Sequence, residues 1–164
     1  MITSANTSVN CRKLPAIYTN KAAQKIYSGK SVIDLGCGKF DNAKHFAESL
    51  GCEVGMYDPY NRTLKENQIA VSRKYDVAII SNVLNVIQDS LDRWALIDMA
   101  SVLAPTILVT VYEGDGTGVG RQTKPDCWQE NRPTESYVGE IAGVLPEYSV
   151  TRKGKLIIAE KERS

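Results

Sequence analysis

Two short segments, residues 31–38 and residues 54–58, constrain the fold of this chain more than any other part of the sequence. The first, Ser-Val-Ile-Asp-Leu-Gly-Cys-Gly, predicts a buried strand that ends in a glycine turn, with Asp34 just before the turn. The second, Val-Gly-Met-Tyr-Asp, predicts a strand that ends in a carboxylate, Asp58. In nucleotide-binding α/β domains an acid in this place meets the two ribose hydroxyls. The two segments together therefore predict an adenosine-type ligand.

The glycines of the turn have a physical purpose. A side chain at Gly36 or Gly38 would hold the backbone away from a ligand, and we expect the turn to need positive φ angles. A dinucleotide fingerprint would have a third glycine, but Asp41 occupies that place. Its charge would oppose a pyrophosphate at the start of the next helix, so an NAD-dependent oxidoreductase is disfavoured.

The rest of the chain alternates between strand and helix patterns. Apolar periodicity predicts helices over residues 19–27 and 42–50, a strand over 75–81, a helix that Asp89 or Ser90 caps, and a strand over 106–112. Asp41 or Asn42 is expected to cap the second of these helices, and Thr134 to cap a last helix. Residues 148–152 and 155–160 predict a hairpin around Lys153-Gly154. The pattern predicts a Rossmann-like, doubly wound α/β fold with a mostly parallel sheet and a C-terminal antiparallel hairpin.

The segment Asp34-Leu35-Gly36-Cys37-Gly38 resembles the first motif of class I S-adenosylmethionine-dependent methyltransferases. The resemblance implies S-adenosylmethionine as cofactor and S-adenosylhomocysteine as product. It also implies that Gly36 and Gly38 line the methionine part, that Asp34 holds the ammonium directly or through water, and that Asp58 takes both ribose hydroxyls. The implied cofactor-binding set is Asp34, Leu35, Gly36, Cys37, Gly38, Asp58, Pro59, Ser81 and Asn82.

Residues 81–87, Ser-Asn-Val-Leu-Asn-Val-Ile, follow the third predicted strand, where the family keeps residues that touch the methionine moiety or the methyl acceptor. Asn82 and Asn85 offer neutral amide donors and acceptors, and Asn82 is the preferred substrate-side candidate. Asn85 has the alternative purpose of holding the turn after the strand. The Pro-Pro-aromatic sequence of DNA-adenine methyltransferases is absent here.

Two regions depart from the family pattern or from an ordinary domain. Only residues 59–74 separate the second and third predicted strands, so residues 69–71 are interpreted as a much shortened extra strand, which puts the adenine pocket in doubt. Residues 113–133 predict a long structureless loop that could close over the site as a lid. In it, Trp128 could stack on a flat substrate and Arg121 or Lys124 could meet a phosphate or carboxylate. The alternative is a surface loop with Trp128 packed on the sheet edge.

Composition limits the remaining possibilities. The 164 residues fit one domain, expected over 18–164 after a flexible segment 1–17. Twenty basic and nineteen acidic residues leave a net charge of +1, so the overall charge does not support nucleic-acid binding. Any contact with DNA or RNA would have to be local. The four cysteines form no C-x-x-C pair and His45 is the single histidine, so no metal site is expected and His45 has no assigned role. The sequence predicts a cytoplasmic protein without a membrane segment.

A narrower resemblance involves Tyr57-Asp58-Pro59-Tyr60, residues 81–87, Asp89 and Arg93. These residues are similar to methyltransferases associated with DNA phosphorothioation clusters and to their phage-encoded relatives. The expected function is methyl transfer by in-line displacement to an undefined acceptor, either a nucleic-acid component or a small molecule, with no acid–base dyad required. The alternative is a non-catalytic module that binds S-adenosylmethionine to sense it or to scaffold a partner.

Overall fold

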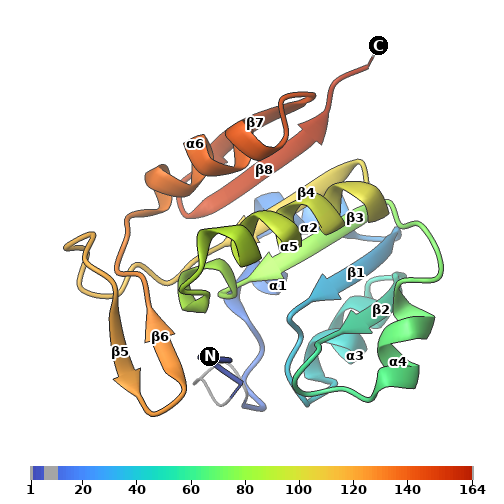
Figure 1. Ribbon diagram of the computed structural model, residues 1–164. Coiled ribbons are helices and arrows are strands. Elements are labelled where there is room, and N and C mark those ends of the chain that lie inside the picture. Colours follow the sequence, from blue (N-terminus) through green and yellow to red (C-terminus); the bar gives the residue numbers. More distant parts are fainter. Residues whose placement is uncertain (1, 6–10, 164) are drawn as a thin grey trace.

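The computed structural model describes residues 2–5 and 11–163, and within them a six-stranded sheet has the order β2-β1-β3-β4-β8-β7 (Figure 1). The neighbouring pairs β2–β1, β1–β3 and β3–β4 are parallel, whereas β8 pairs antiparallel with both β4 and β7. This confirms the predicted Rossmann-like fold and its C-terminal hairpin. The strands are β1 (Ser31–Leu35), β2 (Glu53–Tyr57), β3 (Val77–Ser81), β4 (Thr106–Thr110), β7 (Tyr148–Lys153) and β8 (Leu156–Lys161).

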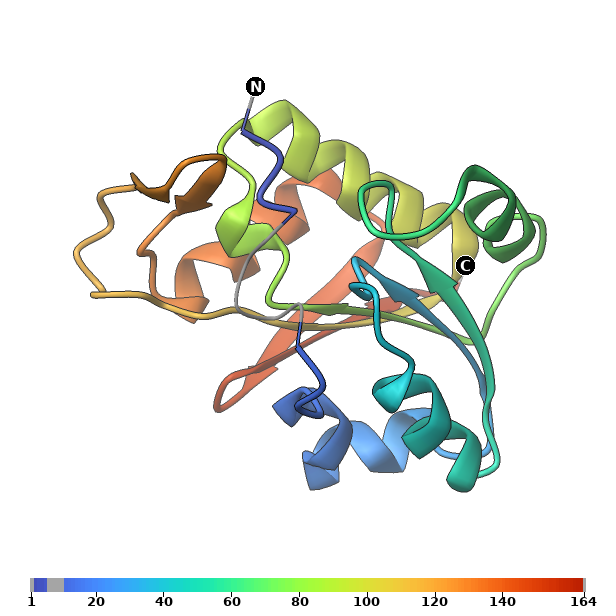
Figure 2. The ribbon, with the colours of Figure 1, turned by 90° about the horizontal axis from the view of Figure 1, so that it is seen from below.

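Helices cover both faces of the sheet (Figure 2). Alternate residues of each buried strand point to opposite faces, so Val32 joins one core cluster and Ile33 the other. One face carries α1 (Ala16–Thr19), α2 (Lys21–Tyr27) and α3 (Asn42–Ser49); the other carries α4 (Leu64–Ala70), α5 (Ser90–Leu103) and α6 (Thr134–Val144). Such two-sided burial explains why the central strands β3 and β4 are nearly continuous apolar runs.

The helices begin close to the predicted positions, but only one of the three predicted side-chain caps is formed. The Asp89 carboxylate accepts a hydrogen bond from Leu91 N at 2.8 Å and caps α5 as predicted. Asp41 precedes α3, but its side chain makes no capping bond. The prediction for Thr134 is wrong, because Pro133 holds the N-cap position of α6 and Thr134 N donates to Glu113 Oε2 at 2.6 Å.

The predicted short strand at residues 69–71 is also wrong. Residues Leu64–Ala70 form α4, which begins with a capping box in which Thr63 and Glu66 satisfy each other's backbone N–H groups. This reciprocal cap stabilises a helix where the apolar triplet alone indicated a strand. Among the described residues, β2 is consequently an edge of the sheet.

The segment after β4 is not structureless, which corrects the loop prediction. It contains β5 (Arg121–Lys124) and β6 (Cys127–Gln129), which pair antiparallel as a separate two-stranded sheet. Asp126 turns the chain between them with a φ of 62°, a conformation that aspartate tolerates better than most side chains. We call residues 121–129 the β5–β6 hairpin.

Residues 2–5 lie beside this hairpin, while the predicted flexibility of residues 1 and 6–10 falls outside the described residues. Ser4 is 7% exposed, and its backbone N donates to Asp126 O at 2.8 Å. The side chain and backbone N of Thr3 both donate to the Asp126 carboxylate. No helix in the described part of the chain has the length and apolar character to cross a membrane.

Candidate functional site

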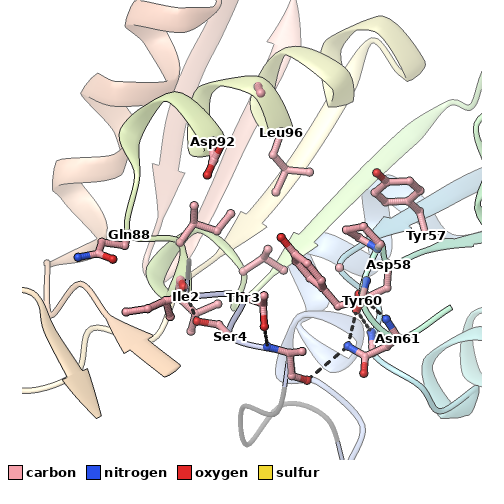
Figure 3. A pocket seen from close by; sticks show the side chains of 18 of the residues that line it. Ile2, Thr3, Ser4, Tyr57, Asp58, Tyr60, Asn61, Gln88, Asp92 and Leu96 are labelled. Carbon is pink, nitrogen blue, oxygen red and sulfur yellow. Dashed lines mark hydrogen bonds between the residues drawn. The ribbon is translucent and has the colours of Figure 1, made fainter. Parts of the chain in front are cut away.

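A cavity of about 730 Å³ opens at the carboxyl ends of β1, β2 and β3 (Figure 3). We call it the larger cavity. Its walls come from the glycine turn after β1, from residues 57–61 at the end of β2, from residues 82–89 after β3, and from one side of α5. Residues 2–5 complete the lining. A crevice at this edge of a parallel sheet is where α/β proteins bind ligands.

The glycine turn has the predicted backbone conformation, but contact with a neighbouring loop is an additional reason for glycine at position 36. Gly36 and Gly38 have φ angles of 88° and 73°, which confirms the predicted positive φ. Both glycines line the larger cavity. A Cβ atom on Gly36 would lie 2.5 Å from Val83 Cγ2, so this glycine is also required by the neighbouring loop after β3. The backbone N of Gly36 donates to Tyr57 O at 2.8 Å, which links the turn to β2.

Asp58 lines the larger cavity and is 6% exposed. Its Oδ2 accepts hydrogen bonds from Gly38 N at 2.9 Å and from Asn61 Nδ2 at 3.2 Å. Its Oδ1 accepts from Tyr60 N at 3.0 Å and from Asn61 N at 3.1 Å (Figure 3). One carboxylate thus fixes both the glycine turn and the turn after β2, a structural role that the sequence pattern did not indicate.

Asp34 lies behind the turn, outside the lining of the larger cavity. It is 3% exposed, and the Tyr18 hydroxyl, itself fully buried, donates to Asp34 Oδ2. Burial raises the pKa of Asp34 to about 6, and the hydrogen bond from Tyr18 acts against this rise. Burial and the nearby Asp34 charge raise the pKa of Tyr18 well above its usual value. A cation near Asp34 would favour the charged carboxylate.

Arg62 holds the outer side of the turn. Its Nε donates to Gly38 O at 2.8 Å, its Nη2 donates to Phe40 O at 2.9 Å, and its Nη1 lies 2.7 Å from Asp41 Oδ1. The side chain is 9% exposed. Sequence reasoning missed Arg62, because a single arginine in a polar segment between strand and helix carries no local signal.

A second cavity of about 450 Å³ lies between the loop after β3 and the β5–β6 hairpin. We call it the smaller cavity. Asn82 and Val86 line both cavities, so the two meet at the end of β3. Asn82 has a φ of 55°, and its backbone N donates to Thr110 O at 2.9 Å, which fixes the start of the loop against β4.

The structure brings together only part of the predicted substrate side. Asn85 and Trp128 line the smaller cavity together with Asn82, whereas Arg121 is exposed and lines neither cavity. Trp128 is half-buried and packs against Gly120, where a Cβ atom would lie 2.4 Å from its Cζ2. Lys124, the predicted alternative to Arg121, also lines the smaller cavity.

Of the remaining predicted cofactor-binding residues, one lines the larger cavity and three do not. Pro59 lines the larger cavity, while Leu35 is fully buried in the core. Ser81 is 7% exposed and lies at the end of β3, where its Oγ accepts a hydrogen bond from Thr110 Oγ1 at 3.4 Å. Cys37 is half-buried in the turn, and burial raises the pKa of its thiol.

A buried ion-pair network supports both cavities from behind. The Arg93 side chain is 8% exposed, and its guanidinium pairs with Glu130, which follows β6, and with Glu140 of α6. The same group donates to Ile87 O at 2.8 Å and Gln88 O at 3.2 Å, which belong to the wall of the larger cavity. Arg93 thereby joins the loop after β3 to the β5–β6 hairpin.

Residues 2–5 connect the two sides of the larger cavity. Ser4 Oγ donates to Val86 O at 2.7 Å and accepts from Trp128 N at 3.2 Å. Asn61 Nδ2 reaches Ala5 O at 3.4 Å on the opposite side. The Ser- and Thr-rich composition of this segment gave no signal for these contacts, because each partner lies far away in the sequence.

The charges of the larger cavity match a positively charged ligand. Asp58, Asp89 and Asp92 contribute to the lining, and among the described lining residues there is no lysine or arginine. Such a surface favours the sulfonium and ammonium groups of S-adenosylmethionine and disfavours a polyphosphate. In the part of the chain that the structure describes, no cluster of three metal-ligating side chains occurs. His45 is exposed on α3.

Comparisons with known proteins agree with this geometry. Residues 10–115 match a family described as a methyltransferase domain. Magnesium protoporphyrin IX methyltransferase from Synechocystis PCC 6803, solved with bound S-adenosylmethionine, superimposes with a TM-score of 0.57 at 17% identity, over 90% of this chain and 77% of that chain. The ribosomal protein L11 methylase from Lactobacillus delbrueckii subsp. bulgaricus superimposes with a TM-score of 0.51 at 12% identity, over 90% and 76% of the two chains.

At these identities the two structures establish the shared fold, and no curated protein matches the sequence. The family match covers more than half of the chain, and the acidic cavity beside the glycine turn suits its cofactor. The chain therefore belongs to the methyltransferase domain family and is a class I S-adenosylmethionine-dependent methyltransferase.

Proposed function

We propose that this methyltransferase holds S-adenosylmethionine in the larger cavity and methylates an acceptor in the smaller cavity. The observation that carries the proposal is that Asn82 and Val86 line both cavities. Two ligands bound on either side of these residues would meet at the end of β3. Holding two reactants in this way is the main contribution that a methyltransferase fold has to make.

The cofactor would lie along the glycine turn, with its adenosyl part toward α5. Leu96 and Met99 provide apolar surface there, which suits an adenine ring although the sheet ends at β2. The buried Asp34 carboxylate would face the ammonium group, directly or through water. When bound, S-adenosylmethionine supplies a methyl group on a positively charged sulfur, and the cofactor leaves as S-adenosylhomocysteine.

Asp58 is proposed to hold the ribose hydroxyls, with one adjustment. Its carboxylate already accepts four N–H groups, which occupy the usual acceptor sites of two oxygens. The donor that moves most readily is Asn61 Nδ2, because it belongs to a side chain and makes the longest of these bonds at 3.2 Å. Exchange of this donor for a ribose hydroxyl would preserve the two turns.

The acceptor is proposed to be a small molecule or a single nucleic-acid component. The smaller cavity has a volume of about 450 Å³, and Lys124 is the one charged residue in its described lining. No carboxylate or histidine belongs to that lining, so the residues present would orient the acceptor rather than remove its proton. Orientation alone lowers such a barrier by roughly 7 to 11 kcal/mol.

Incubation with S-adenosylmethionine carrying a labelled methyl group tests the proposal. With extracts fractionated into small molecules and nucleic acids, the label should appear in one fraction. The Trp128→Ala variant, which changes a residue that lines the smaller cavity but not the larger one, should transfer it about tenfold more slowly while binding the cofactor normally. Calorimetric binding of the cofactor without transfer to any fraction would favour the alternative of a non-catalytic binding module. Absence of cofactor binding would contradict both.

The narrower relationship to phosphorothioation-associated and phage-encoded methyltransferases stays a prediction, as does a cytoplasmic location. Neither of the matched structures named above is described in those terms. The residues of that resemblance have structural contacts of their own, since Arg93 joins the ion-pair network and Asp89 caps α5. Labelled transfer to phosphorothioated against ordinary DNA would test the relationship directly.

A further inference from the structure

Two amide side chains and one backbone carbonyl form a hydrogen-bonded chain in the wall of the smaller cavity. Gln129 Nε2 donates to Tyr112 O at 2.9 Å, and Asn85 Nδ2 donates to Gln129 Oε1 at 3.1 Å. Asn85 is 2% exposed and Gln129 is 8% exposed. The Asn85 backbone is held as well, because its carbonyl accepts from Glu130 N at 2.8 Å. The side chains therefore have little freedom to rearrange.

The polarity of this chain of hydrogen bonds follows from its first member. A backbone carbonyl only accepts, so Gln129 must turn its NH₂ group toward Tyr112 and its Oε1 toward Asn85. Asn85 must then present its NH₂ group to Gln129, because the reverse orientation would bring two carbonyl oxygens together. The group of Asn85 left over is its Oδ1, a hydrogen-bond acceptor.

Asn85 Oδ1 is buried and accepts no hydrogen bond within the described part of the chain. Three other neutral polar atoms share this condition, namely Trp128 Nε1, Thr134 Oγ1 and Tyr137 Oη. Of these, Trp128 lines the smaller cavity together with Asn85, whereas Thr134 and Tyr137 do not. A buried polar group without a partner is costly, and one in a cavity wall gains its partner when a ligand enters.

The two unpartnered atoms have complementary requirements. Asn85 Oδ1 needs an N–H or O–H donor, and Trp128 Nε1, which only donates, needs an acceptor. Around them the lining is largely neutral or apolar, with Val86, Val111 and the Trp128 ring, and its charged member Lys124 is exposed. A neutral planar molecule that carries both a donor and an acceptor would satisfy both atoms.

We infer that the smaller cavity selects a neutral planar acceptor that donates an N–H or O–H to Asn85 Oδ1 and accepts from Trp128 Nε1. Aromatic amides, lactams and amino-substituted nitrogen heterocycles belong to this class. Gln129 is a positioning residue that fixes the orientation of the Asn85 amide. The assignment rests on the proposed function only in taking the occupant of this cavity to be the methyl acceptor.

Benzamide and acetophenone form a matched pair of probes, because they have nearly the same shape and carbonyl group but only benzamide carries N–H donors. Titration of the ¹⁵N-labelled protein without cofactor, followed by NMR, gives the affinity of each probe and the shift of the Asn85 side-chain amide. Benzamide should bind about tenfold more tightly than acetophenone, the ratio expected for one buried hydrogen bond.

Three variants separate recognition from packing. Asn85→Leu should bring the two probes to within about twofold of each other, because it removes the acceptor and keeps the volume. Gln129→Leu should also abolish the preference, since the Asn85 amide would lose its fixed orientation. Thr123→Val should retain it, because Thr123 lines the cavity but takes no part in this chain of hydrogen bonds. The Gln129→Leu and Thr123→Val variants keep the test decisive if Asn85→Leu fails to fold.

Equal affinity of the wild-type protein for both probes, tighter binding of acetophenone, or no binding of benzamide up to its solubility would overturn the inference. A preference for benzamide that survives Asn85→Leu would overturn it too. Calorimetry with S-adenosylmethionine on the same samples tests the proposed function separately. Loss of cofactor binding with the benzamide preference intact would contradict the proposed function and leave the chemistry of the smaller cavity standing.

Discussion

The glycine turn after β1 and the β5–β6 hairpin border the same pair of cavities, but they are held in different ways. The turn is fixed by short links within one βαβ unit, from Asp58 to Gly38 and from Arg62 to Gly38. The hairpin is fixed by distant partners, from Ser4 to Trp128 and from Arg93 to Glu130. The cofactor side thus depends on local geometry, and the acceptor side depends on contacts between segments far apart in the chain.

The largest effect should come from the network behind the hairpin. Arg93→Ala should lower the free energy of unfolding by about 3 to 5 kcal/mol, because it leaves the largely buried Glu130 carboxylate without its partner and removes one of the two arginines that pair with Glu140. Urea denaturation measures the change. Arg73→Ala is the matched control, because Arg73 forms an exposed pair with Glu53 and should change stability by no more than about 0.5 kcal/mol. Equal effects would mean that the hairpin does not depend on the buried network.

The glycine turn should show a smaller but still large effect. Gly36→Ala should cost about 2 to 4 kcal/mol of unfolding free energy, since its Cβ would collide with Val83 in addition to the strain of a positive φ. Gly116 also has a positive φ, 72°, but an added Cβ atom would have no neighbour within 4 Å. Gly116→Ala should therefore lower the free energy of unfolding by only about 1 to 2 kcal/mol. If denaturation curves of the two variants coincide, the contact with Val83 has no energetic weight.

Substitution of Asp58 tests whether this one side chain both stabilises the fold and binds the cofactor. Asp58→Asn should weaken S-adenosylmethionine binding by about 1.5 to 3 kcal/mol in calorimetry, because a charged acceptor of ribose hydroxyls is lost. The unfolding free energy should fall as well, since Gly38 N and Tyr60 N lose a charged acceptor. Asp98→Asn, at an exposed position of α5 outside both cavities, should change neither quantity. A loss of stability with unchanged affinity would leave Asp58 with a structural role alone.

Protonation of Asp34 should make cofactor binding depend on pH. Burial raises its pKa from 3.8 to about 6, so the unliganded protein keeps this proton in a range where the unfolded chain has lost it. This contribution to stability is therefore present below pH 3.8 and is lost as the pH rises through 6. An ammonium group beside Asp34 needs the charged form, so affinity should rise by up to about tenfold per pH unit as the pH approaches 6 from below.

Calorimetry in buffers of different ionisation enthalpy should detect proton release when S-adenosylmethionine binds near pH 5.5. The Asp34→Asn variant, which cannot titrate, should bind weakly at every pH and release no proton. An affinity of the wild-type protein that stays constant between pH 5 and pH 7 would argue against contact between Asp34 and the ammonium group.

The smallest effect concerns the N-terminal contact with the hairpin. Ser4→Ala should lower the unfolding free energy by about 1 kcal/mol, because Ser4 Oγ both donates to Val86 O and accepts from Trp128 N. Hydrogen exchange at Trp128 N should become faster, while exchange in β1 should not change. Faster exchange in both places would mean that the hairpin and the sheet unfold together rather than as separate units.

The difference between the two regions also explains what the sequence could predict. The strand before Gly36, the carboxylate at Asp58 and the C-terminal hairpin are encoded within a few residues, and all are present. Residues 69–71 were misinterpreted because the capping box of Thr63 and Glu66, rather than the apolar triplet, determines the local structure.

The acceptor side lay beyond sequence reasoning for a different reason. Asn85 meets Gln129 across 44 residues, and Ser4 meets Trp128 across 124, so neither pair produces a periodic or local pattern. The β5–β6 hairpin was missed because its strands are only four and three residues long and lie among glycines. Asn82 and Trp128, both predicted on the substrate side, line the smaller cavity, and their roles there stay predictions.

A crystal structure with S-adenosylhomocysteine tests the central claim most directly. The account predicts the adenosyl group in the larger cavity, with its ribose at Asp58, its ammonium toward Asp34 and its sulfur next to Asn82, facing an open smaller cavity. A product molecule that occupies the smaller cavity, or a larger cavity that stays empty at saturating ligand with Asp58 still bound only to its four N–H groups, would contradict it.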